Sequence, residues 1–165
     1  MTAIWLLVGA ACTLAARALL VRALLAKFRR DVAALNRGDH RSLLNAYAED
    51  AVLRFNDGPH RWAGEHRGKA AIERFLQNLT SAGLKGEIRA LWMAGPPWAL
   101  RLVARFDDAA YGPGGELIYQ NQTCLVVHTR WGRIVLHEDF YFDTGRMVDF
   151  ESALLRLGVQ RASED

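Results

Sequence analysis

Four strand-like runs, separated by very short turn sequences, occupy the second half of the chain. They cover residues 87–93, 98–107, 116–129 and 133–142, and the separators contain "AGPP", "YGPGG" and "TRWG". Short separators rich in Gly and Pro favour tight hairpins, and strands joined by hairpins pair in antiparallel fashion. This feature predicts an antiparallel sheet at the centre of the fold.

Helical patterns precede and follow these strands. Apolar residues recur at helical spacing between residues 21 and 35, the sequence "NRGDH" at 36–40 carries helix-stop and helix-start signals, and further helices are predicted over residues 41–48, 69–79 and 150–157. Residues 50–56 predict a strand and residues 57–68 a loop. Helices followed by a hairpin-built sheet indicate an α+β domain. We place this domain at residues 28–159, with a disordered tail at 160–165.

The N-terminal segment, residues 1–27, is predicted to be an apolar helix. Residues 3–16 carry no charge, and basic residues follow at Arg17, Arg22, Lys27, Arg29 and Arg30. A membrane span needs about 20 apolar residues, so the segment is marginal in length. Basic residues on the C-terminal side favour a membrane anchor with the domain on the cytoplasmic side. A cleaved secretory signal remains an alternative, as does a first helix packed on the domain or a partner in a soluble cytoplasmic protein.

The composition argues against several partners. The 165-residue chain has a net charge of +3, but its basic residues do not form a patch interleaved with aromatic residues. This distribution argues against nucleic-acid binding. The five histidines and the distant Cys12 and Cys124 show no metal-ligand spacing, so no metal ion is predicted.

Three phrases resemble a known family in their order and spacing. "VAALNRGDHRSLLNAYAEDAVL", "RGKAAIERFLQNL" and "GRIVLHEDFYFDTGRM" are similar to the opening helices, third helix and last hairpin of the SnoaL-like group of the nuclear-transport-factor-2-like superfamily. The resemblance implies a curved antiparallel sheet wrapped by about three helices into a cone around an apolar pocket. It also implies acid/base chemistry without a cofactor on a small apolar molecule, and, by analogy, a homodimer through the open face of the sheet.

A catalytic set follows from a narrower resemblance, to limonene epoxide hydrolase within this superfamily. The Arg-x-Asp of that family falls on Arg105 and Asp107, and its further aspartate falls on Asp139. By resemblance, Asp139 takes a proton from water, Asp107 gives one to the epoxide oxygen, and Arg105 bridges the two carboxylates. The prediction is that these three side chains converge in one pocket.

Strand alternation supports a competing interpretation. Residues 98, 100, 102, 104 and 106 are all apolar, so simple alternation makes them the buried set and places Arg105 and Asp107 on the solvent face. The last strand also contains an extra residue within "HEDFYFD", which predicts a β-bulge. If the bulge precedes Asp139, Glu138 is expected to point inward instead.

Polar residues on or beside the strands supply the candidates for substrate binding. Asp57 could also replace the base of a steroid-isomerase type of site. The predicted set is Asn56, Asp57, Asn121, Gln122, His137, Glu138 and Tyr141. The leading functional hypothesis is an epoxide hydrolase. A polyketide or terpenoid cyclase or isomerase and a non-catalytic module that binds a hydrophobic ligand or a partner at the membrane are the alternatives.

Overall fold

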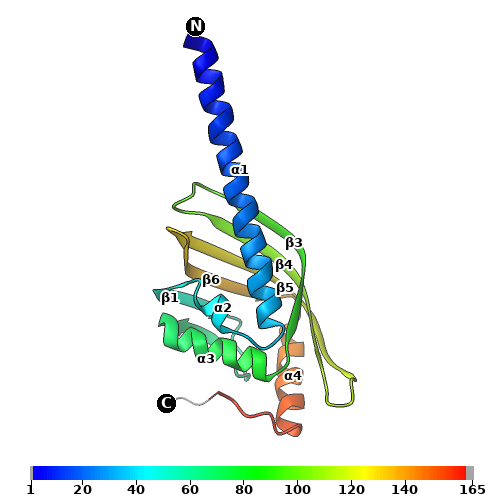
Figure 1. Cartoon of the computed structure of the whole chain (residues 1–165). Helices are drawn as coiled ribbons and strands as arrows, with labels where there is room; N and C mark the ends of the chain where they lie inside the picture. Colours follow the sequence, from blue (N-terminus) through cyan, green and yellow to red (C-terminus); the bar gives the residue numbers. More distant parts are fainter. Residues whose placement is uncertain (1, 163–165) are drawn as a thin grey trace.

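A curved sheet packed against helices forms the body of the protein, and one long helix projects from it (Figure 1). The computed structural model describes residues 2–162, with side chains from residue 18 onward. Within these residues the chain forms four helices and six strands. They are α1 Thr2–Leu35, α2 Arg41–Leu44, β1 Tyr47–Phe55, β2 Gly64–Arg67, α3 Gly68–Ser81, β3 Lys85–Ala94, β4 Arg101–Tyr111, β5 Leu117–Arg130, β6 Arg133–Tyr141 and α4 Thr144–Arg156. The α+β class is confirmed.

The sheet has the strand order β2-β1-β6-β5-β4-β3. Strands β3 to β6 are joined by the predicted hairpins and pair in antiparallel fashion. The prediction of a wholly antiparallel sheet is wrong at β1 and β6, which pair in parallel. A parallel pair needs a long connection, and the chain between these strands supplies one because it includes α3 and four further strands.

Two short elements differ from the sequence prediction. Residues 64–67, predicted as part of a loop, form β2 and pair with β1, although the surrounding glycines and proline favour irregular structure. Helix α2 ends at Leu44 rather than continuing to residue 48. Tyr47 instead begins β1, where its side chain is buried.

The last helix begins earlier than the apolar stripe at 150–157 indicated. Asp143 occupies the N-cap in extended conformation, and its side chain accepts a hydrogen bond of 3.2 Å from the backbone N–H of Arg146. Such a cap satisfies one of the free N–H groups of the first turn. Helix α4 therefore starts at Thr144, within the segment that the sequence analysis assigned to no element.

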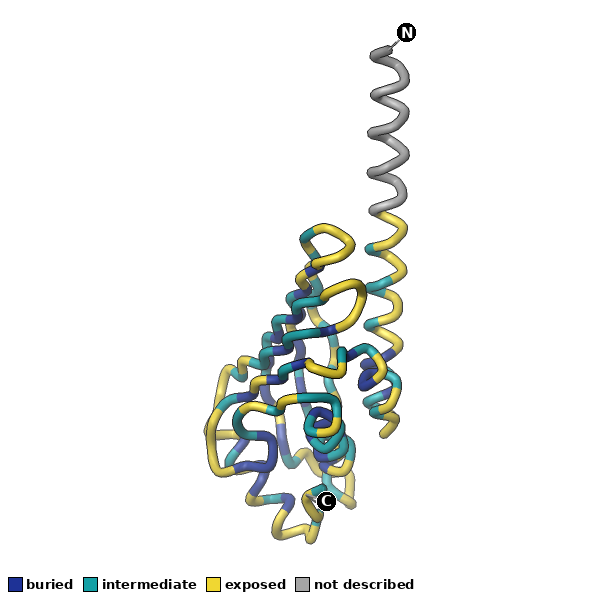
Figure 2. The backbone as a smooth tube through the Cα atoms, turned by 90° about the vertical axis from the view of Figure 1, so that its left-hand side faces the viewer, coloured by how far each residue is buried: buried dark blue, intermediate teal, exposed yellow. Residues whose placement is uncertain are grey.

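Helix α1 joins the predicted leader and the predicted first helix into one continuous helix. Its C-terminal half packs beside the sheet (Figure 2). Asn36, just after its end, donates to the carbonyl oxygen of Gly86 (2.9 Å) and accepts from the N–H of Gly86 (3.0 Å). These two bonds fasten the end of α1 to the edge strand β3.

The predicted membrane anchor is not tested by this helix. The uncharged run at residues 3–16 lies outside the residues whose side chains are described. Among the helices of the described chain, none has an apolar stretch that is long enough to span a bilayer. The anchor therefore remains a prediction.

A buried ion pair fastens the C-terminal segment. The Arg61 guanidinium donates to the Glu151 carboxylate (2.7 Å), and both side chains are almost completely buried. Arg61 also donates to the backbone carbonyls of Val159 (3.1 Å) and Gln160 (3.0 Å). Residues 160–162, predicted to be disordered, are therefore held against the domain, while residues 163–165 lie outside the described part of the chain.

Candidate functional site

Alternation along β4 decides where the predicted catalytic residues lie. Leu102, Ala104 and Phe106 are buried on the inner face of the sheet, and Asp108 continues this set. Arg105 is exposed on the opposite, outer face. The alternative based on strand parity is thus confirmed for this strand.

Asp107 shares the outer face with Arg105. Its carboxylate accepts hydrogen bonds from Arg89 (2.6 Å) and Gln122 (3.0 Å). The bond from Arg89 holds the pKa of Asp107 below its usual value. The predicted convergence of Arg105 and Asp107 with Asp139 in one pocket is therefore wrong, because the two strand positions differ in parity from the buried set.

The orientation of β6 is set by a β-bulge at Val135. The pairing with β5 shifts between His128↔Leu136 and Thr129↔Ile134, so one residue of β6 has no partner. After the bulge, His137 and Asp139 face inward. Glu138 faces outward and accepts a hydrogen bond from Arg54 (3.1 Å). The predicted position of the bulge within "HEDFYFD" is wrong, because the bulge lies before this segment and the pairing with β5 is regular from Leu136 to Tyr141. The inward direction expected for Glu138 if a bulge preceded Asp139 is wrong as well.

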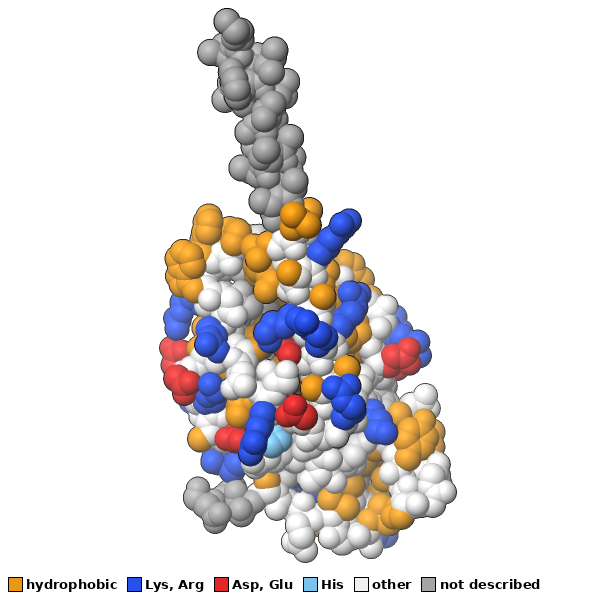
Figure 3. All heavy atoms as spheres, in the orientation of Figure 1, with side chains coloured by type: hydrophobic (Ala, Val, Ile, Leu, Met, Phe, Trp, Pro, Cys, Tyr) orange, Lys and Arg blue, Asp and Glu red, His pale blue; other side chains and the backbone are white. Residues whose placement is uncertain are grey.

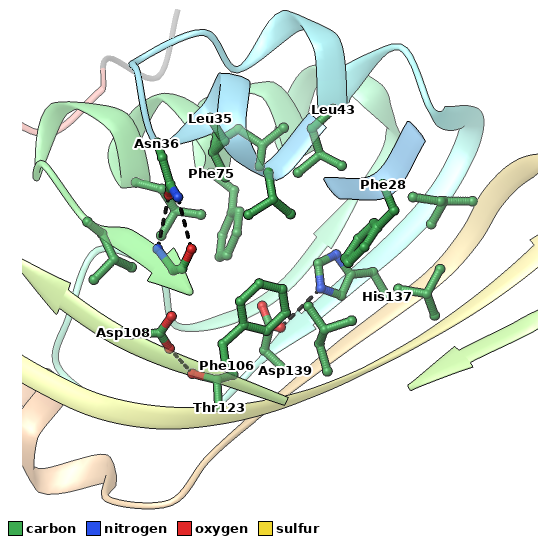
Figure 4. A pocket seen from close by; sticks show the side chains of 18 of the residues that line it. Phe28, Leu35, Asn36, Leu43, Phe75, Phe106, Asp108, Thr123, His137 and Asp139 are labelled. Carbon is green, nitrogen blue, oxygen red and sulfur yellow. Dashed lines mark hydrogen bonds and ion pairs between the residues drawn. The ribbon is translucent and has the colours of Figure 1, made fainter. Parts of the chain in front are cut away.

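A cavity of about 90 Å³ lies between the inner face of the sheet and the helices α1, α2 and α3. Apolar side chains such as Phe28, Leu35, Leu43 and Phe75 form most of its wall (Figure 4). Polar groups gather on the strand side of the same cavity. They are Tyr47, Asp108, Thr123, His137, Asp139 and Tyr141.

Asp108 is the carboxyl group most altered by this environment. Burial raises its pKa from 3.8 to about 7, because an apolar surrounding disfavours the charged form. A short hydrogen bond from the Thr123 hydroxyl opposes the increase, whereas the negative charges of Asp139 and Asp107 add to it. At neutral pH, Asp108 can therefore both hold and release a proton.

Asp139 is held by a hydrogen-bonded chain. Its Oδ1 lies 3.0 Å from Nε2 of His137, and Nδ1 of His137 lies 2.5 Å from the Tyr47 hydroxyl. Burial, with the charge of Asp139 as a smaller cause, raises the pKa of Tyr47 well above its usual value. Tyr47 therefore keeps its proton and donates it to Nδ1, so Nε2 carries the proton that His137 donates to Asp139.

Tyr141 completes the polar side of the cavity. Its pKa is raised mainly by burial and further by the charges of Asp108 and Asp139. The phenol is thus a hydrogen-bond donor throughout the neutral pH range. Its backbone N–H is fixed by Asn56, whose Oδ1 accepts from it at 3.0 Å.

Only part of the predicted substrate-binding set lines this cavity. His137 and Tyr141 do so, as does Asp139 from the predicted catalytic set. Asn121 is buried but donates to the backbone of Asp143 (2.7 Å), and Asp57 is exposed. Asn56, Asp57, Asn121, Gln122 and Glu138 are not among the cavity-lining residues.

Three residues of the site were missed by the sequence analysis. Asp108 lies two residues beyond Phe106 and continues the alternation that marks the buried face, so extending that pattern would have found it. Tyr47 was assigned to a helix, and Thr123 had no distinguishing signal. In the part of the chain with described side chains, no group of His, Cys, Asp or Glu has the arrangement of a metal site.

A curved sheet closed by helices around an apolar cavity, with carboxyl groups on its strand side, defines an α+β pocket protein of the NTF2-like fold. The sequence profile described as a SnoaL-like domain matches residues 28–137. This match covers more than half of the chain, and the protein belongs to the SnoaL-like family. None of the curated proteins compared with the chain matches it significantly.

Solved structures support the same fold. Bal32a, from a soil-derived mobile gene cassette, is 23% identical, with a TM-score of 0.64, 78% of this chain covered and 95% of that chain. An NTF2-like protein of unknown function from Burkholderia pseudomallei K96243 is 21% identical, with a TM-score of 0.66 and coverage of 78% and 97%. TerC, co-crystallised with polyporic acid, is 16% identical, with a TM-score of 0.63 and coverage of 78% and 98%.

The neighbours also include proteins described by an activity. A proposed polyketide cyclase from Sinorhizobium meliloti is 20% identical, with a TM-score of 0.54 and coverage of 70% of this chain and 94% of that chain. AclR, a proposed hydroxylase from Streptomyces galilaeus, is 20% identical, with a TM-score of 0.57 and coverage of 83% and 96%. At these identities the likeness concerns the fold alone.

Proposed function

We propose that the protein is a cofactor-independent acid/base enzyme, of the cyclase or isomerase type, that acts on a small apolar carbonyl compound. The observation that carries this proposal is the placement of two carboxyl groups, Asp108 and Asp139, in different hydrogen-bonding environments on one side of an apolar cavity. Two acids in unlike environments are suited to opposite roles in proton transfer.

The roles follow from the contacts of each group. Asp139 accepts a hydrogen bond from His137, which orients its carboxylate in the cavity, and we assign it the role of the base. It removes a proton from the carbon next to the substrate carbonyl. Asp108 in its protonated form donates a hydrogen bond to the carbonyl oxygen, where negative charge develops as the enolate forms.

The enolate then has two outcomes. Return of the proton from Asp139 to a different carbon gives an isomer and restores both carboxyl groups. Attack of the enolate carbon on a second carbonyl of the same molecule forms a carbon–carbon bond, and Asp108 or Tyr141 supplies the proton to the new alkoxide. The proposed polyketide cyclase and the polyporic-acid complex among the structural neighbours support this substrate class only by analogy of fold.

The arrangement of side chains does not support epoxide hydrolysis of the limonene type. That chemistry requires a guanidinium between two acids, and Arg105 lies on the outer face of the sheet, away from Asp139. No arginine is among the residues that line the described cavity. The acid pair of the proposal is consequently Asp108 and Asp139 rather than Asp107 and Asp139.

Exchange of carbon-bound hydrogen tests the proposal without knowledge of the natural substrate. The full-length protein is incubated in D2O with cyclohexanone and cyclohex-2-enone, and loss of the proton next to the carbonyl is followed by NMR. Exchange is expected above the buffer rate and should fall by roughly 10²-fold or more in Asp139→Asn, the scale of one lost general base. Asp107→Asn is the matched control on the outer face and should leave exchange unchanged. Equal rates in the wild type and Asp139→Asn would overturn the proposal in favour of a non-catalytic binding module.

We further propose that one end of the domain meets a membrane surface. Trp131 is 79% exposed and has a φ of 51°, and its ring lies 6.4 Å from that of the exposed Trp98. A bulky side chain at positive φ is strained, and this turn position favours Asn or Gly. Hydrophobic side chains gather around the point where α1 leaves the domain (Figure 3), and tryptophan is typical of membrane interfaces.

Vesicle sedimentation of the full chain tests this surface. Binding to vesicles that contain phosphatidylserine is expected to weaken in the double variant Trp98→Ser with Trp131→Asn. The control Trp92→Ser removes another exposed tryptophan, which lies on the outer face of β3. If neither variant changes the bound fraction, the tryptophan surface has no membrane role.

A further inference from the structure

A second cavity lies next to the first. It also measures about 90 Å³ and lies between α1 and the ends of the strands at the β3–β4 and β5–β6 hairpins. Leu24, Met93, Leu100 and Leu102 form much of its wall, and Gly132 also lines it. None of the acids of the proposed site lines it.

The two cavities share a wall. Phe28, Leu43, Val127 and Ile134 line both of them. Leu43, Val127 and Ile134 are buried core residues, whereas Phe28 is only partly buried. The ring of Phe28 meets that of Phe106 edge to face, with 6.3 Å between the centroids. Phe28 is therefore the shared side chain that is freest to change rotamer.

Neither cavity alone is large enough for a substrate of more than a few atoms. An apolar cavity of about 150 Å³ holds a benzene molecule, and ligand sites usually measure about 300–1,000 Å³. The two cavities together offer about twice the volume of either. A ring the size of benzene therefore already needs part of both cavities, and a compound with a longer alkyl chain must extend further through the second one.

We infer that the second cavity is a subsite for the apolar tail of the substrate, an alkyl or aryl group, and that Phe28 determines the length of tail that is accepted. The inference rests on the proposed function, because it places the reacting carbonyl at Asp108 and Asp139. The tail then extends past Phe28 toward Leu100 and Met93.

The chemistry of the second cavity fits such a tail. Its wall is apolar except for Lys27, Asp31 and Thr129. Lys27 and Asp31 form an ion pair with 2.5 Å between Nζ and Oδ2, and Asp31 also accepts a hydrogen bond of 2.8 Å from Ser42. Lys27 and Asp31 thus neutralise each other, and the Thr129 hydroxyl donates to the carbonyl oxygen of Leu100 (3.2 Å), so the subsite has no charged group that requires a polar tail. Each methylene that leaves water should strengthen binding roughly fourfold.

Binding of alkylbenzenes to the full chain tests the subsite. Benzene, ethylbenzene and n-butylbenzene are titrated by calorimetry, and the wild type is expected to bind the longer compounds more tightly. Phe28→Ala removes the partition and should raise the affinity for n-butylbenzene at least tenfold more than that for benzene. Phe140→Ala, which shortens an exposed phenylalanine on the outer face, should change neither value.

A filling variant provides the opposite change. Met93 is partly buried on β3, so Met93→Trp reduces the space of the second cavity without removing a buried core residue. It should weaken binding of n-butylbenzene at least tenfold more than that of benzene. Equal effects on all three compounds in both Phe28→Ala and Met93→Trp would overturn the inference. The binding assay involves no turnover, so failure of the subsite inference can be distinguished from failure of the proposed chemistry. Absence of hydrogen exchange would refute only the proposed chemistry.

Discussion

Replacing Asp108 by Asn should change how the stability of the protein depends on pH. Burial raises the pKa of Asp108 from 3.8 to about 7. The folded state therefore binds a proton between these two values that the unfolded state has already lost, so stability falls as pH rises through this range. The free energy needed to ionise Asp108 in the folded state reaches an upper bound of about 4 kcal/mol above pH 7, since one unit of pKa corresponds to about 1.4 kcal/mol.

The size of the effect can be worked out for two practical pH values. At pH 5 the cost is on the order of 1.7 kcal/mol, and at pH 8 it is on the order of 4 kcal/mol. Asp108→Asn removes this titration. Relative to the wild type, the variant should gain about 2.5 kcal/mol more in unfolding free energy at pH 8 than at pH 5.

Urea unfolding followed by tryptophan fluorescence measures this difference. Trp62 is completely buried and stacks on Phe150, so its emission reports on the folded core. Asp107→Asn serves as the control because the pKa of Asp107 is lowered, chiefly by its bond from Arg89. Ionised Asp107 stabilises the folded state above the pKa that it has in the unfolded chain, and this contribution is lost only as the pH falls toward acid. The unfolding free energy of Asp107→Asn should therefore run parallel to that of the wild type between pH 5 and 8. Parallel behaviour of Asp108→Asn as well would refute the reasoning.

Three further predictions concern other contacts. Tyr47→Phe leaves Nδ1 of His137 unpaired in a buried site and should lower the unfolding free energy by about 1–3 kcal/mol in urea; an unchanged value would show that the hydroxyl makes no stabilising bond. Glu151→Gln leaves the buried Arg61 without its counter-charge and should lower the unfolding free energy by about 3–5 kcal/mol in thermal or urea unfolding. Proteolysis of the C-terminal segment should also become faster, and a wild-type rate of cleavage would contradict the role of this pair in holding that segment. A homodimer through the outer face of the sheet, expected from the family resemblance, should dissociate in Phe140→Asp when mass is measured by light scattering, and a monomeric wild type would end that prediction.

The fold was largely predictable because its main signals are local. Hairpin separators identified β3 to β6, and the stripe around Phe75 identified α3, since burial of one face imposes a regular period on the sequence. Strand β2 and the parallel pairing of β1 with β6 were missed. Strand β2 has only four residues and lies in a segment rich in Gly, and β6 is distant in the chain from β1, so no local pattern specifies either pairing.

The site was predictable only in part because inward and outward directions depend on register. Asp139 and His137 were identified, yet the inward direction of Asp139 is fixed by a bulge at Val135 that the sequence does not locate. Family resemblance favoured Asp107, while the alternation that ends in Phe106 continued to Asp108. The physical pattern was the better guide at this strand, because a single change of parity moves a carboxyl group to the other face.

Carboxyl ¹³C NMR titration of the full-length protein, with Asp108 assigned by comparison with Asp108→Asn, measures the ionisation of this carboxyl group inside the cavity. We expect a titration midpoint for Asp108 near the pKa of about 7, and a change in that midpoint when n-butylbenzene fills the cavity and removes water from it. A midpoint close to the ordinary aspartate value of about 4, unaffected by the ligand, would contradict the claim that Asp108 is a buried proton donor in an apolar pocket.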